Sequence, residues 1–168
     1  MAISAERINR TSPYEVKQAD EYSVFFINKY GVRYSVGFAH DYHFMEEGAY
    51  QFYITNIDNK TSPADKNIYI TISAIVEDFF ANEQAVMIYF CDTKDNRQAM
   101  RDRLFQIWFH TYENNVNFSM FNEHVTIDNI IYFASIILRK DHPLHNEVIA
   151  SFHNFVSTVP DKLNQLQS

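Results

Sequence analysis

Two segments of this sequence are apolar at almost every position, and they constrain the fold more than any other feature. Residues 85–91 (AVMIYFC) and 130–138 (IIYFASIIL) carry apolar side chains on both alternations of an extended chain. A strand with one face in water alternates between apolar and polar residues, whereas a strand apolar on both faces lies inside a sheet that is covered on both sides. The two segments therefore predict central strands of a covered sheet.

Further strands are predicted around these two. Four segments are dense in aromatic and β-branched residues, namely 22–27, 32–38, 49–57 and 118–124. The first two flank a short turn that ends at Gly31, which is typical of a β-hairpin. The last precedes Asp128-Asn129, and this turn predicts a second hairpin with the central strand at 130–138.

Three helices are predicted from apolar residues at helical spacing. The first covers about 68–80, and Ser62-Pro63 before it suits a cap followed by proline in the first turn. The second covers about 96–113, and the third begins near His142-Pro143 and ends at Pro160. The order βββ-α-β-α-ββ-α predicts the α+β class, with one mostly antiparallel or mixed sheet of about six strands and three helices.

The 168 residues contain no linker, internal repeat or low-complexity segment, so we expect a single domain over residues 1–168. The polar ends at 1–13 and 161–168 are expected to be mobile tails. Hydrophobic residues make up 46% of the chain, which is enough to build a core without disulfides or metals.

Charge and cysteine content argue against several classes of partner. The net charge of -7 repels phosphate backbones, so we expect no nucleic acid and no anionic membrane as a partner. No run of about 18 apolar residues is present, so no membrane-spanning helix is expected. The single cysteine, Cys91, excludes an internal disulfide and fits a cytoplasmic location.

The chain has only three glycines, Gly31, Gly37 and Gly48. Phosphate-binding loops need several glycines, because the backbone must approach the phosphates and adopt positive φ. Neither a dinucleotide fingerprint nor a nucleotide P-loop can be built with these three, and we expect no cofactor.

Three stretches carry a family resemblance: residues 91–98 (CDTKDNRQ) with the arginines and aromatic residues of 101–109 after them, the hairpin that holds Tyr34 and Phe38, and residues 136–141 (IILRKD). They resemble a small, uncharacterised family of Bacteroidetes proteins that carry a domain of unknown function. The resemblance covers roughly residues 14–155. It implies a bacterial, intracellular protein and supplies no activity.

The order of three strands, helix, strand, helix and two strands also resembles the core of GCN5-related acetyltransferases. In that family a glycine-bearing loop before the first of these helices binds the coenzyme pyrophosphate, whereas residues 58–65 contain no glycine. Asn96 and Ala99 match a later motif of the family, but Phe105 stands near the position of a tyrosine that often serves as general acid. The resemblance therefore implies a degenerate acyltransferase-like protein.

A weak ligand site is predicted where the chain leaves the central strand at 85–91 and enters the next helix. Its candidate residues are Asp92, Thr93, Asn96, Arg97 and Arg101. The first turn of a helix offers unpaired N–H groups, and Arg97 and Arg101 extend the positive field along one face. This arrangement suits a carboxylate or an acidic segment of a partner protein. The alternative interpretation is a solvated helix face with salt bridges to Asp95 and Asp102.

Two catalytic or metal patterns are present only in part. Cys91 and Arg97 have the spacing of cysteine-based phosphatases, but Asp92 and Asp95 would raise the pKa of the thiol instead of lowering it. His40 and His43 provide two ligands on one loop, which are too few for a metal site. We identify no catalytic residue and expect no metal.

These observations predict that the protein is a non-enzymatic interaction or regulatory module. We expect it to form a homodimer or to bind another protein. The aromatic hairpin at 22–38 is the predicted dimer face. Two alternatives stay open: a degenerate acyltransferase-like protein, and an accessory protein of a mobile element or a defence system.

Overall fold

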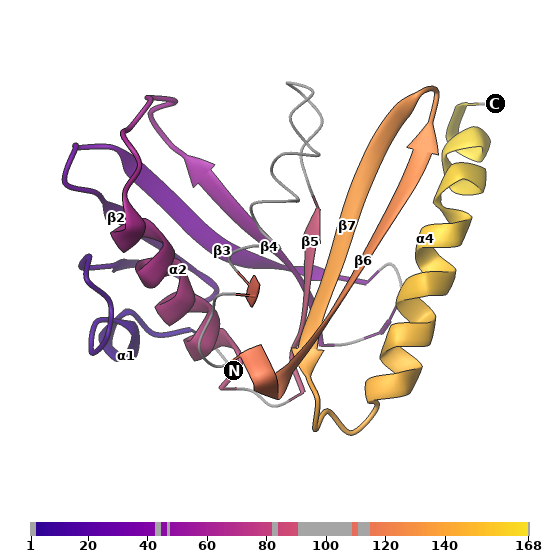
Figure 1. Cartoon of the computed structure of the whole chain (residues 1–168), viewed down its shortest axis with the longest axis horizontal. Helices are drawn as coiled ribbons and strands as arrows, with labels where there is room; N and C mark the ends of the chain where they lie inside the picture. The colour runs from indigo at the N-terminus through magenta and orange to yellow at the C-terminus, as the bar shows by residue number, and fades with distance from the viewer. Residues whose placement is uncertain are drawn as a thin grey trace. The chain divides into compact units, whose positions relative to one another are not determined.

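The computed structural model describes residues 3–42, 45–46, 48–81, 84–90, 109–110 and 115–167. Seven strands form one mixed sheet in the order β1-β2-β3-β4-β5-β7-β6, and three helices are described, α1, α2 and α4 (Figure 1). The predicted α+β class is confirmed, with seven strands where about six were expected. The predicted helix at 96–113 falls mostly outside the described residues.

The described elements have the following bounds. The strands are β1 (Lys17–Asp20), β2 (Ser23–Ile27), β3 (Arg33–Asp41), β4 (Ala49–Asn56), β5 (Val86–Phe90), β6 (Phe118–Ile127) and β7 (Ile130–Arg139). The helices are α1 (Ala5–Ile8), α2 (Lys66–Phe79) and α4 (His145–Gln167), and a 3-10 turn covers Asn115–Asn117.

The chain divides into two compact units. Unit 1 contains Met1–Ala39 and Phe52–Ala85, and unit 2 contains His40–Gln51 and Val86–Ser168. Each unit has a buried apolar cluster of its own, as described below. The expectation of a single domain stays a prediction.

The core of unit 1 lies between α2 and one face of the β2–β3 hairpin. Val24 pairs with Val36 and Phe26 with Tyr34, which places these side chains on the same face of the sheet. Phe38, on that face, stacks on Phe79 of α2 with ring centroids 4.0 Å apart. The hairpin side chains are therefore largely buried inside unit 1, although Ile27 and Tyr30 stay about half exposed.

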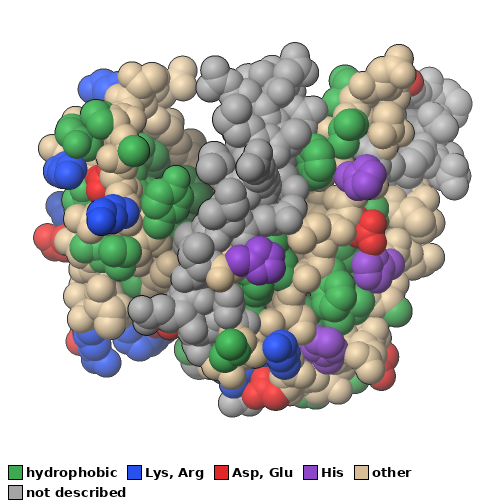
Figure 2. Space-filling view, in the orientation of Figure 1, with side chains coloured by type: hydrophobic (Ala, Val, Ile, Leu, Met, Phe, Trp, Pro, Cys, Tyr) green, Lys and Arg blue, Asp and Glu red, His purple; other side chains and the backbone are tan. Residues whose placement is uncertain are grey.

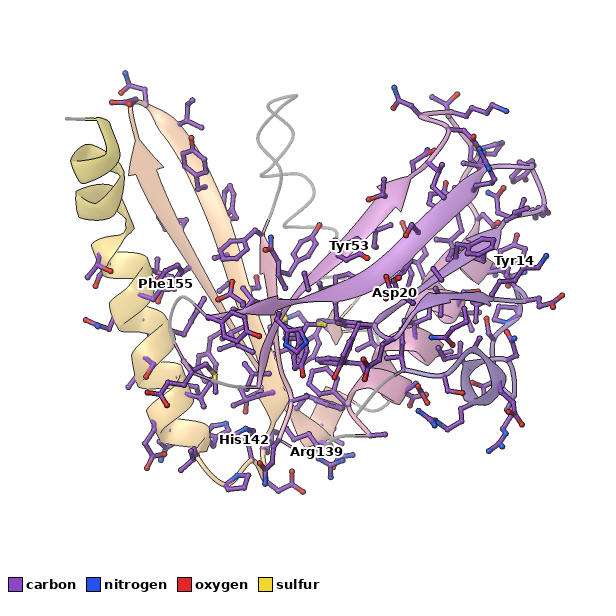
Figure 3. All side chains as sticks on the ribbon, turned by 180° about the vertical axis from the view of Figure 1, so that it is seen from behind. Tyr14, Asp20, Tyr53, Arg139, His142 and Phe155 are labelled. Atoms are coloured by element: carbon purple, nitrogen blue, oxygen red, sulfur yellow. The ribbon has the colours of Figure 1, made fainter. Side chains whose placement is uncertain are left out.

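The other face of this hairpin explains one of the three glycines. A Cβ atom added at Gly37 would overlap the Tyr53 hydroxyl oxygen and would lie 2.8 Å from Ser23 Cβ. Tyr53, on β4, therefore lies directly against the backbone of β3 (Figure 3). Gly37 is required here for close packing and not for a phosphate loop.

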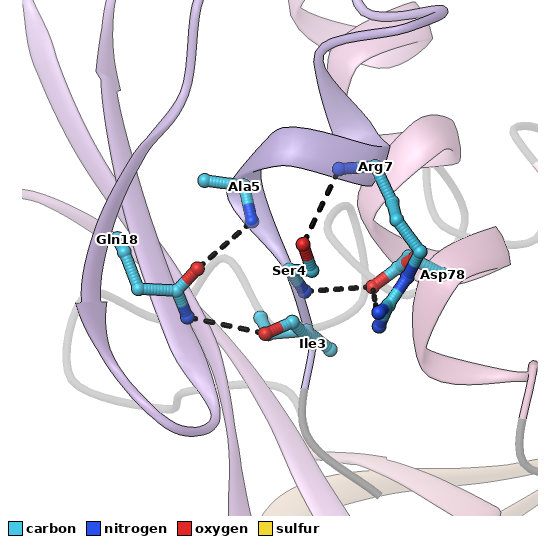
Figure 4. A network of polar contacts seen from close by, with 6 residues as sticks. All are labelled: Ile3, Ser4, Ala5, Arg7, Gln18 and Asp78. Atoms are coloured by element: carbon cyan, nitrogen blue, oxygen red, sulfur yellow. Dashed lines mark hydrogen bonds and ion pairs between the residues drawn. The ribbon is translucent and has the colours of Figure 1, made fainter.

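A polar network joins the N-terminal segment to α2 and β1 (Figure 4). The Asp78 carboxylate accepts hydrogen bonds from the Ser4 N–H and the Arg7 guanidinium, both at 2.8 Å. The Gln18 side chain accepts from the Ala5 N–H and donates to the Ile3 carbonyl. Ile3 and Ile8 are buried, so this segment also adds apolar contacts. The mobility expected for 1–13 stays a prediction.

Unit 2 is built on the strands that the apolar pattern placed in the centre. β7 pairs with both β5 and β6, in each case antiparallel. α4 packs on them through Val148, Phe152 and Val156, which join a buried cluster with Val86, Ala134, Ile136 and Leu138. The predicted hairpin around Asp128-Asn129 is confirmed, since Ile127 pairs with Ile130 across that turn.

Two predicted helix boundaries are wrong. The N-cap of α2 is Asp65, whose side chain accepts from the Asn67 N–H, and not Ser62, whose hydroxyl instead accepts from the Asn28 amide. α4 continues to Gln167 and does not end at Pro160. A proline removes one helical hydrogen bond and can bend a helix without ending it.

Candidate functional site

The ligand site predicted from the sequence falls outside the described part of the chain. Its residues are Asp92, Thr93, Asn96, Arg97 and Arg101, and Cys91 lies in the same stretch. The site therefore stays a prediction. Two other features stand out among the described residues, and both belong to β6 in unit 2.

The first feature is a row of polar side chains between β6 and α4. Ser119 and Glu123 share one face of β6, because strand side chains alternate. Two residues advance about 6.7 Å along a strand, and four residues advance about 6 Å along a helix. Every second residue of a strand can therefore contact every fourth residue of a helix that packs along it. Ser119 accordingly contacts His145, and Glu123 contacts His153, eight residues later on α4. Figure 2 shows histidine and acidic side chains gathered on this unit.

Ser119, His145 and Asn146 form a chain of hydrogen bonds. His145 Nε2 lies 2.9 Å from Ser119 Oγ, and its Nδ1 lies 3.0 Å from Asn146 Oδ1. The donor and acceptor roles depend on the tautomer of the ring. In the neutral tautomer that donates from Nδ1 to the Asn146 amide oxygen, Nε2 accepts the hydroxyl hydrogen of the serine. An activated serine needs an imidazole beside its hydroxyl as general base and a third group that orients the imidazole. Ser119, His145 and Asn146 are arranged in this order.

His153 and Glu123 form the second contact of the row. Nδ1 of His153 lies 2.5 Å from Oε1 of Glu123, and the two side chains are 41% and 35% exposed. Phe121 meets the His153 ring edge-on, with centroids 6.0 Å apart. An exposed contact of this kind contributes little stability, so the apolar residues of α4 are what hold the helix on the sheet.

The second feature is the edge of β6 that faces away from β7. The turn residues Asp128 and Asn129 have φ values of 50° and 66°, which define a type I′ turn. In such a hairpin the flanking residues, Ile127 and Ile130, exchange hydrogen bonds. The bond from the Lys140 N–H to the Asn117 carbonyl fits the same alternation. Odd-numbered residues of β6 therefore bond β7, and even-numbered residues direct their N–H and C=O groups outward.

We call these outward backbone groups the β6 outer edge; they belong to Met120, Asn122, His124 and Thr126. β6 is the last strand of the sheet, and no strand of the described residues pairs with this side. It pairs with β7 over ten consecutive residues without a bulge, and it contains no proline and no lysine. In natural sheets, a bulge, a proline or a lysine at the edge strand usually prevents pairing with another chain.

The opposite end of the sheet is protected in these usual ways. All four residues of β1 are exposed, and they include Lys17 and Asp20. The register with β2 shifts between Gln18 and Asp20, and the Gln18 side chain binds the Ile3 and Ala5 backbone. The two edges therefore differ: β1 carries features that prevent edge pairing, and the described part of β6 does not.

The start of α2 bears on the acyltransferase resemblance, because it follows the loop that would bind a coenzyme pyrophosphate. The buried Asp65 carboxylate caps the Asn67 N–H and accepts a hydrogen bond from the Tyr14 hydroxyl. Burial and this hydrogen bond raise the pKa of the Tyr14 hydroxyl. The helix N-terminus therefore already holds a negative group from the chain itself, which disfavours a second anion there.

The loop after β3 carries the histidine that suggested a metal. His40 stacks on Tyr42 and lies at a tilt against Tyr50, with ring centroids 5.9 Å and 4.6 Å away, and His43 lies outside the described residues. Within the described ranges, no group of three or more histidine, cysteine or acidic side chains could hold a metal ion.

Sequence reasoning missed both features of β6. Ser119 and His145 are 26 residues apart, and only the position of α4 on the sheet brings them together. The open edge depends on strand order, which local patterns do not give. The one available signal was the ten-residue length of the strand before Asp128-Asn129, without proline, glycine or lysine.

Comparison with known proteins gives a family but no activity. No curated protein and no solved structure matches the chain. No helix in the described part of the chain is long and apolar enough to cross a membrane. One family model matches residues 64–154, from the start of α2 into α4, which is more than half of the chain. The chain therefore belongs to the family of unknown function DUF6169.

Proposed function

We propose that this chain is a protein-interaction module that binds a second copy of itself through the β6 outer edge. The observation that carries the proposal is the contrast between the two ends of the sheet: β1 has a register shift and charged, exposed residues, whereas β6 is regular and no described strand pairs with its outer side. An open edge gains affinity from main-chain hydrogen bonds when another extended strand is added to it. The proposal keeps the dimer that the sequence predicted and moves its face from the 22–38 hairpin to β6.

A second copy can pair with this edge without placing like charges opposite each other in β6. Two antiparallel β6 strands related by a two-fold axis perpendicular to the sheet place one residue opposite its own copy. With Asn122 at the centre, Met120 lies opposite His124 of the second copy, and Phe121 lies opposite its Glu123. Glu123 is the only acidic residue of β6, and this register keeps the two copies of it apart.

Proline at position 122 tests the proposal. Asn122→Pro removes an outward N–H group and places the proline ring at the edge of the sheet. An edge strand tolerates this substitution, because no hydrogen bond to β7 is lost. Asn122→Thr is the matched control, because both variants lose the hydrogen bond between Ser135 and the Asn122 side chain while threonine keeps the backbone donor. We expect the wild type and Asn122→Thr to be dimers at high micromolar concentration and Asn122→Pro to be a monomer.

Analytical ultracentrifugation measures the oligomeric state of the three proteins, and circular dichroism verifies that each is folded. Physiological or higher salt is needed, because two copies with a net charge of -7 repel each other. A wild-type monomer at high micromolar concentration would exclude self-association. A folded Asn122→Pro dimer would show that the copies meet elsewhere, with the 22–38 hairpin as the next candidate.

The acyltransferase-like relationship is the second proposal, supported by the order of the described elements β2, β3, β4, α2, β5, β6 and β7. The Asp65 cap argues against coenzyme binding in this protein. We expect isothermal calorimetry to detect no binding of acetyl coenzyme A. A micromolar dissociation constant would reverse the ranking of the two proposals and would direct attention to residues 58–65.

A cytoplasmic location in a bacterium is part of the same proposal. The single cysteine supports a reducing compartment. A self-associating module is compatible with a role as an accessory protein of a mobile element or defence system. The presence of genes of such a system next to the gene for this protein would test this role.

A further inference from the structure

We propose that Ser119 is a nucleophile, activated by His145, that hydrolyses carboxylic esters. This activity goes beyond the interaction role, and it would replace the non-enzymatic interpretation of the sequence. Ser119 faces α4, whereas the β6 outer edge belongs to the even-numbered residues, so the two proposals use different groups and are independent.

The hydrogen-bond chain assigns a role to each side chain. His145 Nε2, 2.9 Å from Ser119 Oγ, is placed to take the hydroxyl proton. Asn146 Oδ1, 3.0 Å from Nδ1, selects the tautomer that leaves Nε2 free to accept it. Ser119 and His145 are catalytic residues in this proposal, and Asn146 is a positioning residue.

The surroundings suit an ester with a short apolar acyl group. Ser119 and His145 are only partly buried, so a small substrate can reach them. Leu144 immediately precedes His145 and is 53% exposed, and Val116 precedes Ser119 by three residues and is 67% exposed. In the first turn of α4 the N–H groups of His145 and Val148 already bond the carbonyls of His142 and Leu144, so an oxyanion would have to use the N–H groups of Asn146 or Glu147.

The reaction has two balanced steps. Ser119 Oγ attacks the carbonyl carbon while its proton passes to His145 Nε2; the carbon–oxygen bond to the alcohol then breaks, and the alcohol leaves with that proton. Water next attacks the acyl-serine, His145 takes a proton from the water and returns it to Ser119, and the carboxylic acid leaves. Water is the only co-reactant, and no oxidation or reduction takes place.

Labelling by a fluorophosphonate probe, located by mass spectrometry, tests the proposal on the full chain, with p-nitrophenyl butyrate hydrolysis as a second readout. We expect covalent labelling at Ser119, which is absent in Ser119→Ala. His145→Gln should slow labelling about 100-fold, since a general base contributes on this scale. Ser157→Ala is the control, because Ser157 is an exposed serine whose hydroxyl donates to the Asn154 carbonyl. It should label as the wild type does.

The positioning role of Asn146 is tested by comparing the labelling rates of two variants at this position. Asn146→Ala should slow labelling, and Asn146→Asp, which keeps an oxygen acceptor for Nδ1, should restore it; a purely structural role of the amide does not predict this rescue. If Ser119 is not labelled in the folded wild type, or if His145→Gln labels Ser119 as fast as the wild type, the proposal is wrong and the contact between β6 and α4 is structural.

Discussion

Replacing Phe152 with alanine is expected to lower the free energy of unfolding by about 3–5 kcal/mol, the range found for large aromatic residues in cores. Phe152 is fully buried and packs between Val148 and Val156 of α4 and the apolar residues of β5 and β7. Alanine removes the ring and leaves a cavity that the rigid strands cannot fill. A loss of this size is a large fraction of the stability of a typical domain.

Urea denaturation measures this effect. Asn154→Ala is the control, because Asn154 is exposed on the same helix and its replacement should change the free energy of unfolding by less than about 0.5 kcal/mol. A loss below about 1 kcal/mol for Phe152→Ala would mean that α4 is not anchored on the sheet as described. In that case Ser119 and His145 would also lose the support that holds them together.

The apolar pattern correctly predicted two inner strands of the sheet. Residues 85–91 and 130–138 became β5 and β7, and Val86, Ile136 and Leu138 are fully buried. Burial on both faces leaves no polar alternation, so a short, continuous apolar run was a specific signal. The hairpin turns followed equally from local chemistry, through Gly31 and through Asp128-Asn129, all of which have positive φ.

The elements that local patterns did not give depend on contacts made far along the chain. β1, Lys17–Asp20, has no apolar alternation, and it is a strand because it pairs with β2. Ser62 is a good helix cap by residue type, but its hydroxyl accepts a hydrogen bond from the Asn28 amide, 34 residues earlier. Asp65 therefore caps the helix, and no window around residue 62 could show this.

The candidate site was less predictable than the fold. The residues favoured by the sequence, from Asp92 to Arg101, lie outside the described part of the chain. The Ser119–His145 contact depends on the packing of α4 against β6, which brings together residues 26 positions apart. The β6 outer edge required strand order, because any of the predicted strands could have been last in the sheet.

Backbone hydrogen exchange along β6 tests the central proposal most directly, because the alternation of β6 amides predicts which of them respond to self-association. At low concentration we expect the outward amides of Met120, Asn122 and His124 to exchange fast, since they have no acceptor among the described residues. Above the dissociation constant of the dimer they should slow about tenfold or more, because exchange then requires the copies to separate.

The inward amides of Phe121 and Glu123 are the internal control, since β7 protects them at every concentration. The measurement is amide exchange by NMR on ¹⁵N-labelled protein, at concentrations well below and well above the onset of association. The account predicts that the even-numbered amides of β6 become protected as concentration rises while the odd-numbered ones do not change. Even-numbered amides that exchange at the same rate at both concentrations would contradict it.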